Sequence, residues 1–160
     1  MPTPDAIALE ILAAGARELA GGQGLEPALK ALLDPLPDRL GVASAAVFVI
    51  SPDGLVIAAA IGLADPATLA AAVRNPDHPV ARTLVHRSAA FDVLPMAAGG
   101  PKLRSHLPLV LGTDGRQEVV GVLALAHDRP LDDRLRLFAA AVADLAAVAV
   151  ARDAERAGRR

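Results

Sequence analysis

Histidines and nearby arginines are the residues of this sequence best suited to bind a ligand. His78, Arg82 and His86 follow one another at intervals of four, which places them on one face of a predicted short helix. Arginine can bind a carboxylate or phosphate through paired hydrogen bonds, and histidine can add further ones. Because the arginine would repel a metal cation, the pattern favours an anion over a metal. The same spacing also fits a solvated face opposite the apolar side of the helix.

Arg104 and His106 form a second candidate pair. They alternate with leucines along a predicted strand, and side chains alternate between the two faces of a strand. If the leucines pack against helices, the pair points to the other side of the sheet. An anion-binding or heme-ligating histidine and a solvent-facing one are both compatible with this position.

Catalytic chemistry has no comparable signal. His127 and Asp128 are adjacent, so on a strand they would point to opposite faces, and no nucleophile accompanies them. The chain has no cysteine, which excludes thiolate nucleophiles, disulfides and cysteine zinc sites. The glycine clusters at 21–24 and 99–100 lack the spacing of a phosphate-binding loop. We therefore predict no catalytic residues, no metal ligands and no enzyme activity.

The elements that must position these residues can be read from hydrophobic spacing and from turn signals. Helices are predicted at 1–20, 25–40, 65–73, 79–87 and 132–156, and strands at 42–50, 55–61, 89–93, 103–111 and 118–126. Pro35 and Pro37 should end the regular part of the second helix near Leu33. Two strand pairs are joined by short turns, which predicts a mainly antiparallel sheet with helices packed on it.

Composition narrows the class of protein. The net charge of -2 gives no electrostatic basis for binding nucleic acid or an anionic membrane. The longest nearly apolar stretch, 139–151, is too short to span a bilayer, and the N-terminus does not resemble a signal peptide. A soluble cytoplasmic domain with no nucleic-acid or membrane partner is the expectation.

The last predicted helix is apolar nearly all round, so it should be buried on more than one side. A sheet can cover only one side. The first helix of the same chain or a second subunit must then cover the other, and the many alanines permit a close helix approach. We predict a homodimer whose interface includes the residues Leu9, Leu12, Leu19, Val142 and Val148.

The order of these pieces resembles the GAF domain family. The resemblance rests on LEPALKALL…LGVASAAVFVISPDGLVIAAAIG, then HPVARTLV, then LRSHLPLVLGTDGRQEVVGVLALA and the final alanine-rich helix. Its best part is the pairing of Pro108-Leu109 with Gly121-Val122-Leu123, although Ser105 and Pro108 lie closer together than is usual in the family. The chain divides accordingly into an N-terminal helix, 1–20, and a GAF-like domain, 25–157.

This resemblance implies an α/β (α+β) fold with a central, mainly antiparallel sheet of about five to six strands. It implies N- and C-terminal helices on one face, and on the other face short helices and loops that enclose a ligand pocket. Two branches of the family, those that attach bilins and those that reduce methionine sulfoxide, use cysteines that this chain lacks. The Asn-Lys-Phe-Asp-Glu pattern of cyclic-nucleotide binders is also missing, so the cofactor stays unknown, with no covalent bilin.

Three functions remain open. The first is a signal-sensing domain that binds a small, partly apolar and anionic ligand between the sheet and the 77–87 helix, with Arg82 as an anion-binding residue. The second is a ligand-free module that dimerises or binds a signalling protein. The third, a roadblock-type GTPase-regulatory platform, fits the first half of the chain but fits the second half less well.

Overall fold

The computed structural model describes residues 24–95, 100–113 and 115–158. Its core is one antiparallel sheet with the strand order β2-β1-β5-β4-β3. The strands are β1 (Val42–Ser51), β2 (Gly54–Ile61), β3 (Ala90–Val93), β4 (Leu103–Thr113) and β5 (Arg116–His127). The sheet confirms the predicted fold class, with five strands. The predicted N-terminal helix at 1–20 lies outside the described residues.

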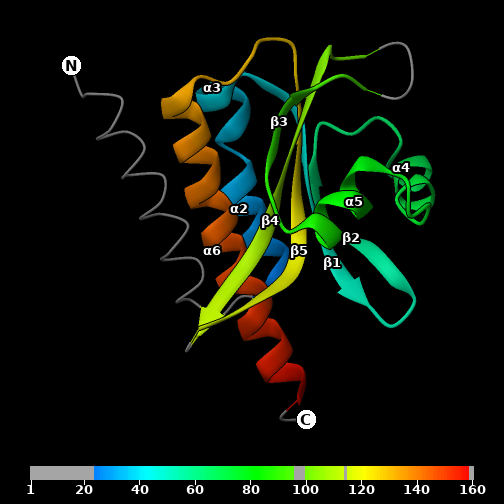
Figure 1. Cartoon of the computed structure of the whole chain (residues 1–160), viewed down its shortest axis with the longest axis vertical. Helices are drawn as coiled ribbons and strands as arrows, with labels where there is room; N and C mark the ends of the chain where they lie inside the picture. The colour runs from blue at the N-terminus through cyan, green and yellow to red at the C-terminus, as the bar shows by residue number, and fades with distance from the viewer. Residues whose placement is uncertain (1–23, 96–99, 114, 159–160) are drawn as a thin grey trace.

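The helices form a layer on each face of the sheet (Figure 1). On one face lie α2 (Leu25–Leu33), α3 (Leu36–Leu40) and the long α6 (Asp133–Gly158). On the other lie α4 (Pro66–Ala72) and α5 (Pro79–His86). No helix among these residues has the length and hydrophobicity that a membrane span requires.

Local signals in the sequence explain where the helices begin and end. Helix α2 ends at Leu33, as the two prolines predict, and a separate short helix, α3, follows it. Asp65 caps α4 by accepting a hydrogen bond from the Thr68 N–H, and Asp132 caps α6 by accepting one from the Leu135 N–H. These caps fix where α4, in the layer on the cavity side of the sheet, and α6, in the layer on the opposite side, begin.

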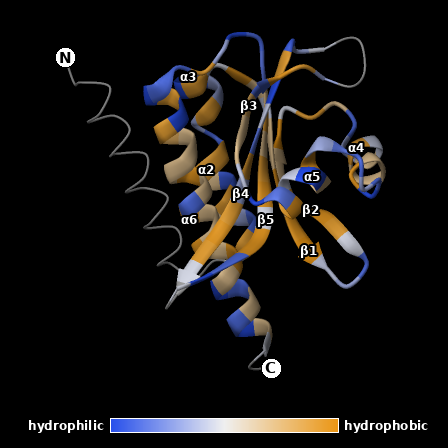
Figure 2. Ribbon diagram, viewed as in Figure 1, coloured by the Kyte–Doolittle hydropathy of each residue, from blue (hydrophilic) through white to orange (hydrophobic). Residues whose placement is uncertain are grey.

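The sheet separates two apolar cores, and hydrophobic residues run along its central strands (Figure 2). The larger core lies between the sheet and α2 and α6, and Leu107 and Leu109 of β4 belong to it. The smaller core lies on the α5 side around Phe48, Val80 and Val122. The leucines of β4 therefore face the helical core as predicted, which leaves alternate residues of that strand on the α5 side.

Candidate functional site

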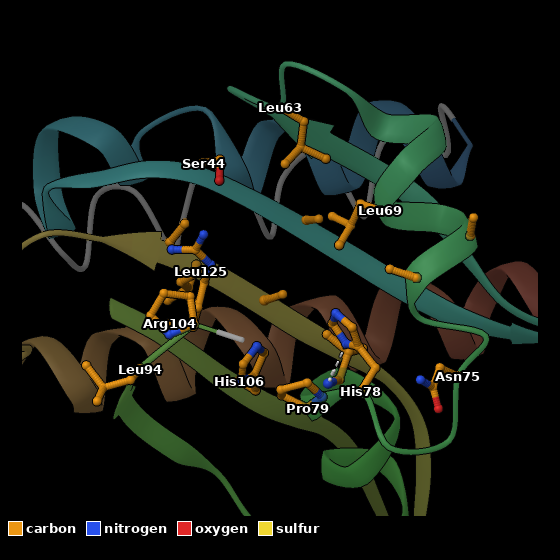
Figure 3. Close-up of a pocket in the computed structure, with 17 residues that line it drawn as sticks. Ser44, Leu63, Leu69, Asn75, His78, Pro79, Leu94, Arg104, His106 and Leu125 are labelled. Carbon is orange, nitrogen blue, oxygen red and sulfur yellow. Dashed lines mark hydrogen bonds between the residues drawn. The ribbon is translucent and has the colours of Figure 1, made fainter. Parts of the chain in front are cut away.

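A cavity of about 490 Å³ lies between the sheet and helices α4 and α5. Its floor comes from small side chains of the central strands, and α4, α5 and the loops beside them form its walls. Figure 3 shows the polar side chains that reach it from β1, β4 and the start of α5. The lining residues are Ser44, Ala46, Leu63, Leu69, Ala71, Ala72, Asn75, His78, Pro79, Val80, Leu94, Pro95, Arg104, His106, Ala124, Leu125 and Ala126.

His106 is the most deeply buried polar residue of this lining, with 4% of its surface exposed. Its Nδ1 atom is buried, and no described residue gives it a hydrogen-bond partner. Burial, followed by the positive charges possible at His78, Arg104 and His127, lowers its pKa to about 4. The imidazole is therefore neutral at pH 7, and a residue of the cavity wall carries a buried polar atom that no described residue satisfies.

Arg104 lies two residues before His106 on the same strand, so both side chains face the cavity. Its Nη1 donates to the carbonyl oxygens of Pro101, over 2.8 Å, and of Leu103, over 3.2 Å. No hydrogen bond or ion pair with any described residue engages its Nε or Nη2. The backbone thus anchors Nη1 of the guanidinium and leaves Nε and Nη2 available to hydrogen-bond a ligand.

His78 stands at the N-terminus of α5 as its capping residue. Its Nδ1 accepts a hydrogen bond from the Val80 N–H over 3.2 Å, so in the neutral ring the proton is on Nε2. Burial lowers the pKa of His78 below its usual value. In Figure 3 this ring lies near His106 at the α5 end of the cavity, whereas Arg104 lies toward Leu94.

The other two residues of the predicted helical face, Arg82 and His86, are exposed and do not line the cavity. The helix instead turns Val80 and Thr83 inward, and the hydroxyl of Thr83 donates to the Pro79 carbonyl over 2.9 Å. Val85, an apolar residue of the same helix, is 75% exposed. Of the predicted face, His78 at the start of the helix therefore reaches the cavity, whereas Arg82 and His86 are directed to solvent.

A second polar cluster lies behind the site, on the α6 side of the sheet. Ser105 Oγ is 2.8 Å from Nε2 of His127, and Nδ1 of that ring is 2.7 Å from the Arg129 carbonyl oxygen. The carbonyl only accepts, so His127 carries its proton on Nδ1, and Ser105 donates to Nε2. The two residues are 22 positions apart in the sequence, and the register of β4 against β5 brings them together.

Asp92 extends this cluster to the start of α6. Its backbone N–H donates to Ser105 Oγ over 3.2 Å, and its carboxylate accepts from the Leu131 N–H and from Arg136. Arg136 also lies over the Phe91 ring, 4.7 Å from its centre. Ser105 is 0% and His127 1% exposed, so the serine–histidine pair is buried. The cluster joins β3, β4, β5 and α6 and has a structural role.

Among the described residues there is no group of three or more His, Cys, Asp or Glu side chains placed to hold a metal ion. The cavity combines one guanidinium, two imidazoles, and an otherwise mostly apolar lining. Such a site can bind a small molecule by burying its apolar part and hydrogen-bonding its polar groups.

Comparisons with known proteins agree with this architecture. Among solved structures, the chain is similar to the GAF domain of a phosphoenolpyruvate-protein phosphotransferase from Coxiella burnetii, with 17% identity, a TM-score of 0.71, and coverage of 94% of this chain and 96% of that one. It is also similar to free methionine-R-sulfoxide reductase from Neisseria meningitidis in complex with its substrate, with 13% identity, a TM-score of 0.71, and coverage of 98% and 95%.

A third similar structure is the second GAF domain of DevS from Mycobacterium smegmatis, with 23% identity, a TM-score of 0.62, and coverage of 82% of this chain and 96% of that one. Identities this low show a shared fold alone. No curated protein matches the sequence. The GAF domain model matches residues 24–150, most of the chain. The chain therefore belongs to the GAF domain family, whose members are generally signal-sensing or regulatory domains.

Proposed function

We propose that this protein is a non-catalytic sensor domain that binds a small molecule in the cavity between the sheet and helices α4 and α5. The observation that carries the proposal is the buried, unpartnered Nδ1 of His106 in the lining of a cavity of about 490 Å³. An unsatisfied buried polar atom costs free energy, and a bound molecule can remove that cost. The ligand-binding residues we propose are His78, Arg104 and His106, whereas Arg82 and His86 are left out.

A catalytic function is not part of the proposal, although one similar structure is a methionine sulfoxide reductase. The resemblance to the GAF family implies that its reductases use cysteines, and this sequence has none. The serine–histidine pair behind the sheet is sealed from solvent and is not in the cavity. The roadblock-type alternative is set aside, because the GAF model matches both halves of the chain. A cytoplasmic location belongs to the same proposal.

Filling the cavity tests the binding function. Ala124 is half-buried on β5, beside His106 on β4, and its side chain lines the floor of the cavity. Replacing it with leucine should place three more carbon atoms in the cavity and weaken ligand binding by roughly tenfold or more, about 1.4 kcal/mol. Thermal unfolding with and without fractions of a cell extract measures this. The native protein should be stabilised by at least one fraction, and Ala124→Leu should not be.

The control is Ala154→Leu, on the exposed last turns of α6. It should respond to the extract like the native protein. If the active fraction stabilises all three proteins equally, binding occurs outside the cavity. If no fraction stabilises the native protein, the ligand-free interaction module becomes the better description.

That second function is favoured by the outer face of α6. Leu137 is 73% exposed and Val148 is 39% exposed, and their spacing places both on the same side of the helix. Val142, which the sequence also assigned to a dimer interface, is 0% exposed because it packs in the core of its own chain. The N-terminal leucines at 9, 12 and 19 lie outside the described residues. A homodimer through α6 therefore stays a prediction.

Sedimentation at micromolar concentration tests it. The native protein should sediment as a dimer, and Val148→Glu should shift it to monomer, because an unpaired carboxylate in an apolar interface is costly. Ala154→Glu, an equal charge change on a different side of the helix, should leave the dimer intact. A native protein that sediments as a monomer would contradict the prediction. Val142→Glu is unsuitable, since it would disrupt the fold itself.

A further inference from the structure

The residues that line the cavity carry an imbalance of charge. Among the described lining residues there is no Asp or Glu, and Arg104 is the fully charged side chain. This guanidinium is partly buried, and its Nε and Nη2 have no partner among the described residues. A partly desolvated cation without a counter-ion is unfavourable, so the cavity is suited to an anion and unsuited to an amine.

The start of α5 decides which anion fits. A helix N-terminus can hold a phosphate through its free backbone N–H groups. Here Pro79 has no N–H, and the N–H of Val80 already donates to the ring of His78. At most one free N–H, that of Ala81, is left among the first three helical residues. A doubly charged phosphate would therefore find too few backbone donors at this terminus.

A carboxylate fits the hydrogen-bond donors that remain at Arg104. Its two oxygen atoms can accept the paired hydrogen bonds that Nε and Nη2 of a guanidinium donate side by side, and it carries a single charge. The cavity floor beside Arg104 and His106 includes Ala46, Ala124 and Ala126, whose small apolar side chains suit an aliphatic ligand. The unpartnered Nδ1 of His106 lies farther along the same strand face, where an uncharged hydroxyl or carbonyl group of the ligand would satisfy it.

We propose that the ligand is a small aliphatic monocarboxylate, bound through its carboxylate to Arg104 and through an uncharged polar group to His106. This inference rests on the proposed sensor function and names the chemical class of its ligand. Free amino acids are disfavoured, because no described lining residue can balance their ammonium group. Nucleotides are disfavoured by the small number of phosphate donors.

The experiment compares matched probes by titration calorimetry. The carboxylates are straight and branched acids of four to eight carbons, with and without a hydroxyl group near the far end; each is paired with its amide and with the phosphate ester of the corresponding alcohol. At least one carboxylate should bind, and its amide should bind roughly tenfold to a hundredfold more weakly, as expected for lost hydrogen bonds to a charged group. The hydroxylated acid should bind more tightly than the plain one.

Variants connect the preference to its residues. Arg104→Gln should remove the preference for carboxylate over amide, whereas Arg39→Gln, an equal charge change at an exposed residue of α3, should keep it. If Arg104→Gln does not fold, Arg104→Lys can be used instead. It keeps the positive charge but loses the two parallel N–H donors of the guanidinium, so it should lower the preference for carboxylate over amide in part. His106→Gln should reduce the gain from the hydroxyl group.

Other outcomes would overturn the inference. Equal binding of acid and amide would show that the cavity takes neutral molecules. Tighter binding of the phosphate ester would show that the ligand is a phosphate ester rather than a carboxylate. Failure of every carboxylate to bind would also reject the proposed ligand class. None of these results decides the sensor function, which the Ala124→Leu comparison tests with unselected extract fractions.

Discussion

Gly121→Ala is expected to destabilise the protein by about 3 kcal/mol or more, enough to unfold much of it under mild conditions. Gly121 lies in β5, the middle strand of the sheet, opposite Val49 of β1 and Leu109 of β4. A Cβ atom there would lie 2.2 Å from the backbone carbonyl oxygen of Phe48. Backbone cannot move aside as a flexible side chain can, so the β1–β5 pairing must open. Typical domains have only about 5–15 kcal/mol of stability.

Urea denaturation followed by circular dichroism measures the change. The matched control is Gly112→Ala in β4, where an added Cβ atom would meet nothing within 4 Å. This variant should stay within about 0.5 kcal/mol of the native protein, as surface substitutions usually do. Equal stability of the two variants would show that β1 and β5 are not this close at Gly121. The same contact gives a physical reason for the glycine in the Gly121-Val122-Leu123 part of the GAF resemblance.

The fold was predictable because its signals are local. The prolines after Leu33 end α2, Asp65 and Asp132 cap their helices, and alternation along β4 assigned its leucines to the helical core. The same alternation placed Arg104 and His106 together on the opposite face, where the cavity lies. Two residues that are two positions apart on a strand point to the same face, whatever packs against the strand.

The rest of the site depends on non-local geometry. The pattern of α5 showed that Arg82 and His86 share a face, but not that Val80 and Thr83 would turn toward the sheet instead. The hydrogen bond between Ser105 and His127 follows from the register of β4 against β5, which no single strand encodes. Pairings of this kind exist only after the sheet has assembled.

The pH dependence of stability is expected to depend strongly on His106. In the folded protein its pKa is lowered from 6.5 to about 4, first by burial and then by the charges of His78, Arg104 and His127. The unfolded chain binds the proton near pH 6.5, so between these values unfolding takes up a proton. The free energy of unfolding should therefore fall as the pH is lowered from 6.5 to 4, by roughly 3 kcal/mol from this residue. Above pH 6.5 the contribution should be constant.

Urea denaturation of the native protein and of His106→Gln at pH 7, 6, 5 and 4.5 tests this. The glutamine cannot take up a proton in this range, so its stability should fall much less between pH 6.5 and 4.5, whatever its absolute stability. His86→Gln, at an exposed histidine of the same cavity-side helix layer, should follow the native curve. Parallel curves for the native protein and His106→Gln would mean that His106 takes up its proton in the folded state as readily as in the unfolded chain. A carboxylate bound at Arg104 should offset part of the native loss, because its negative charge favours the protonated imidazole.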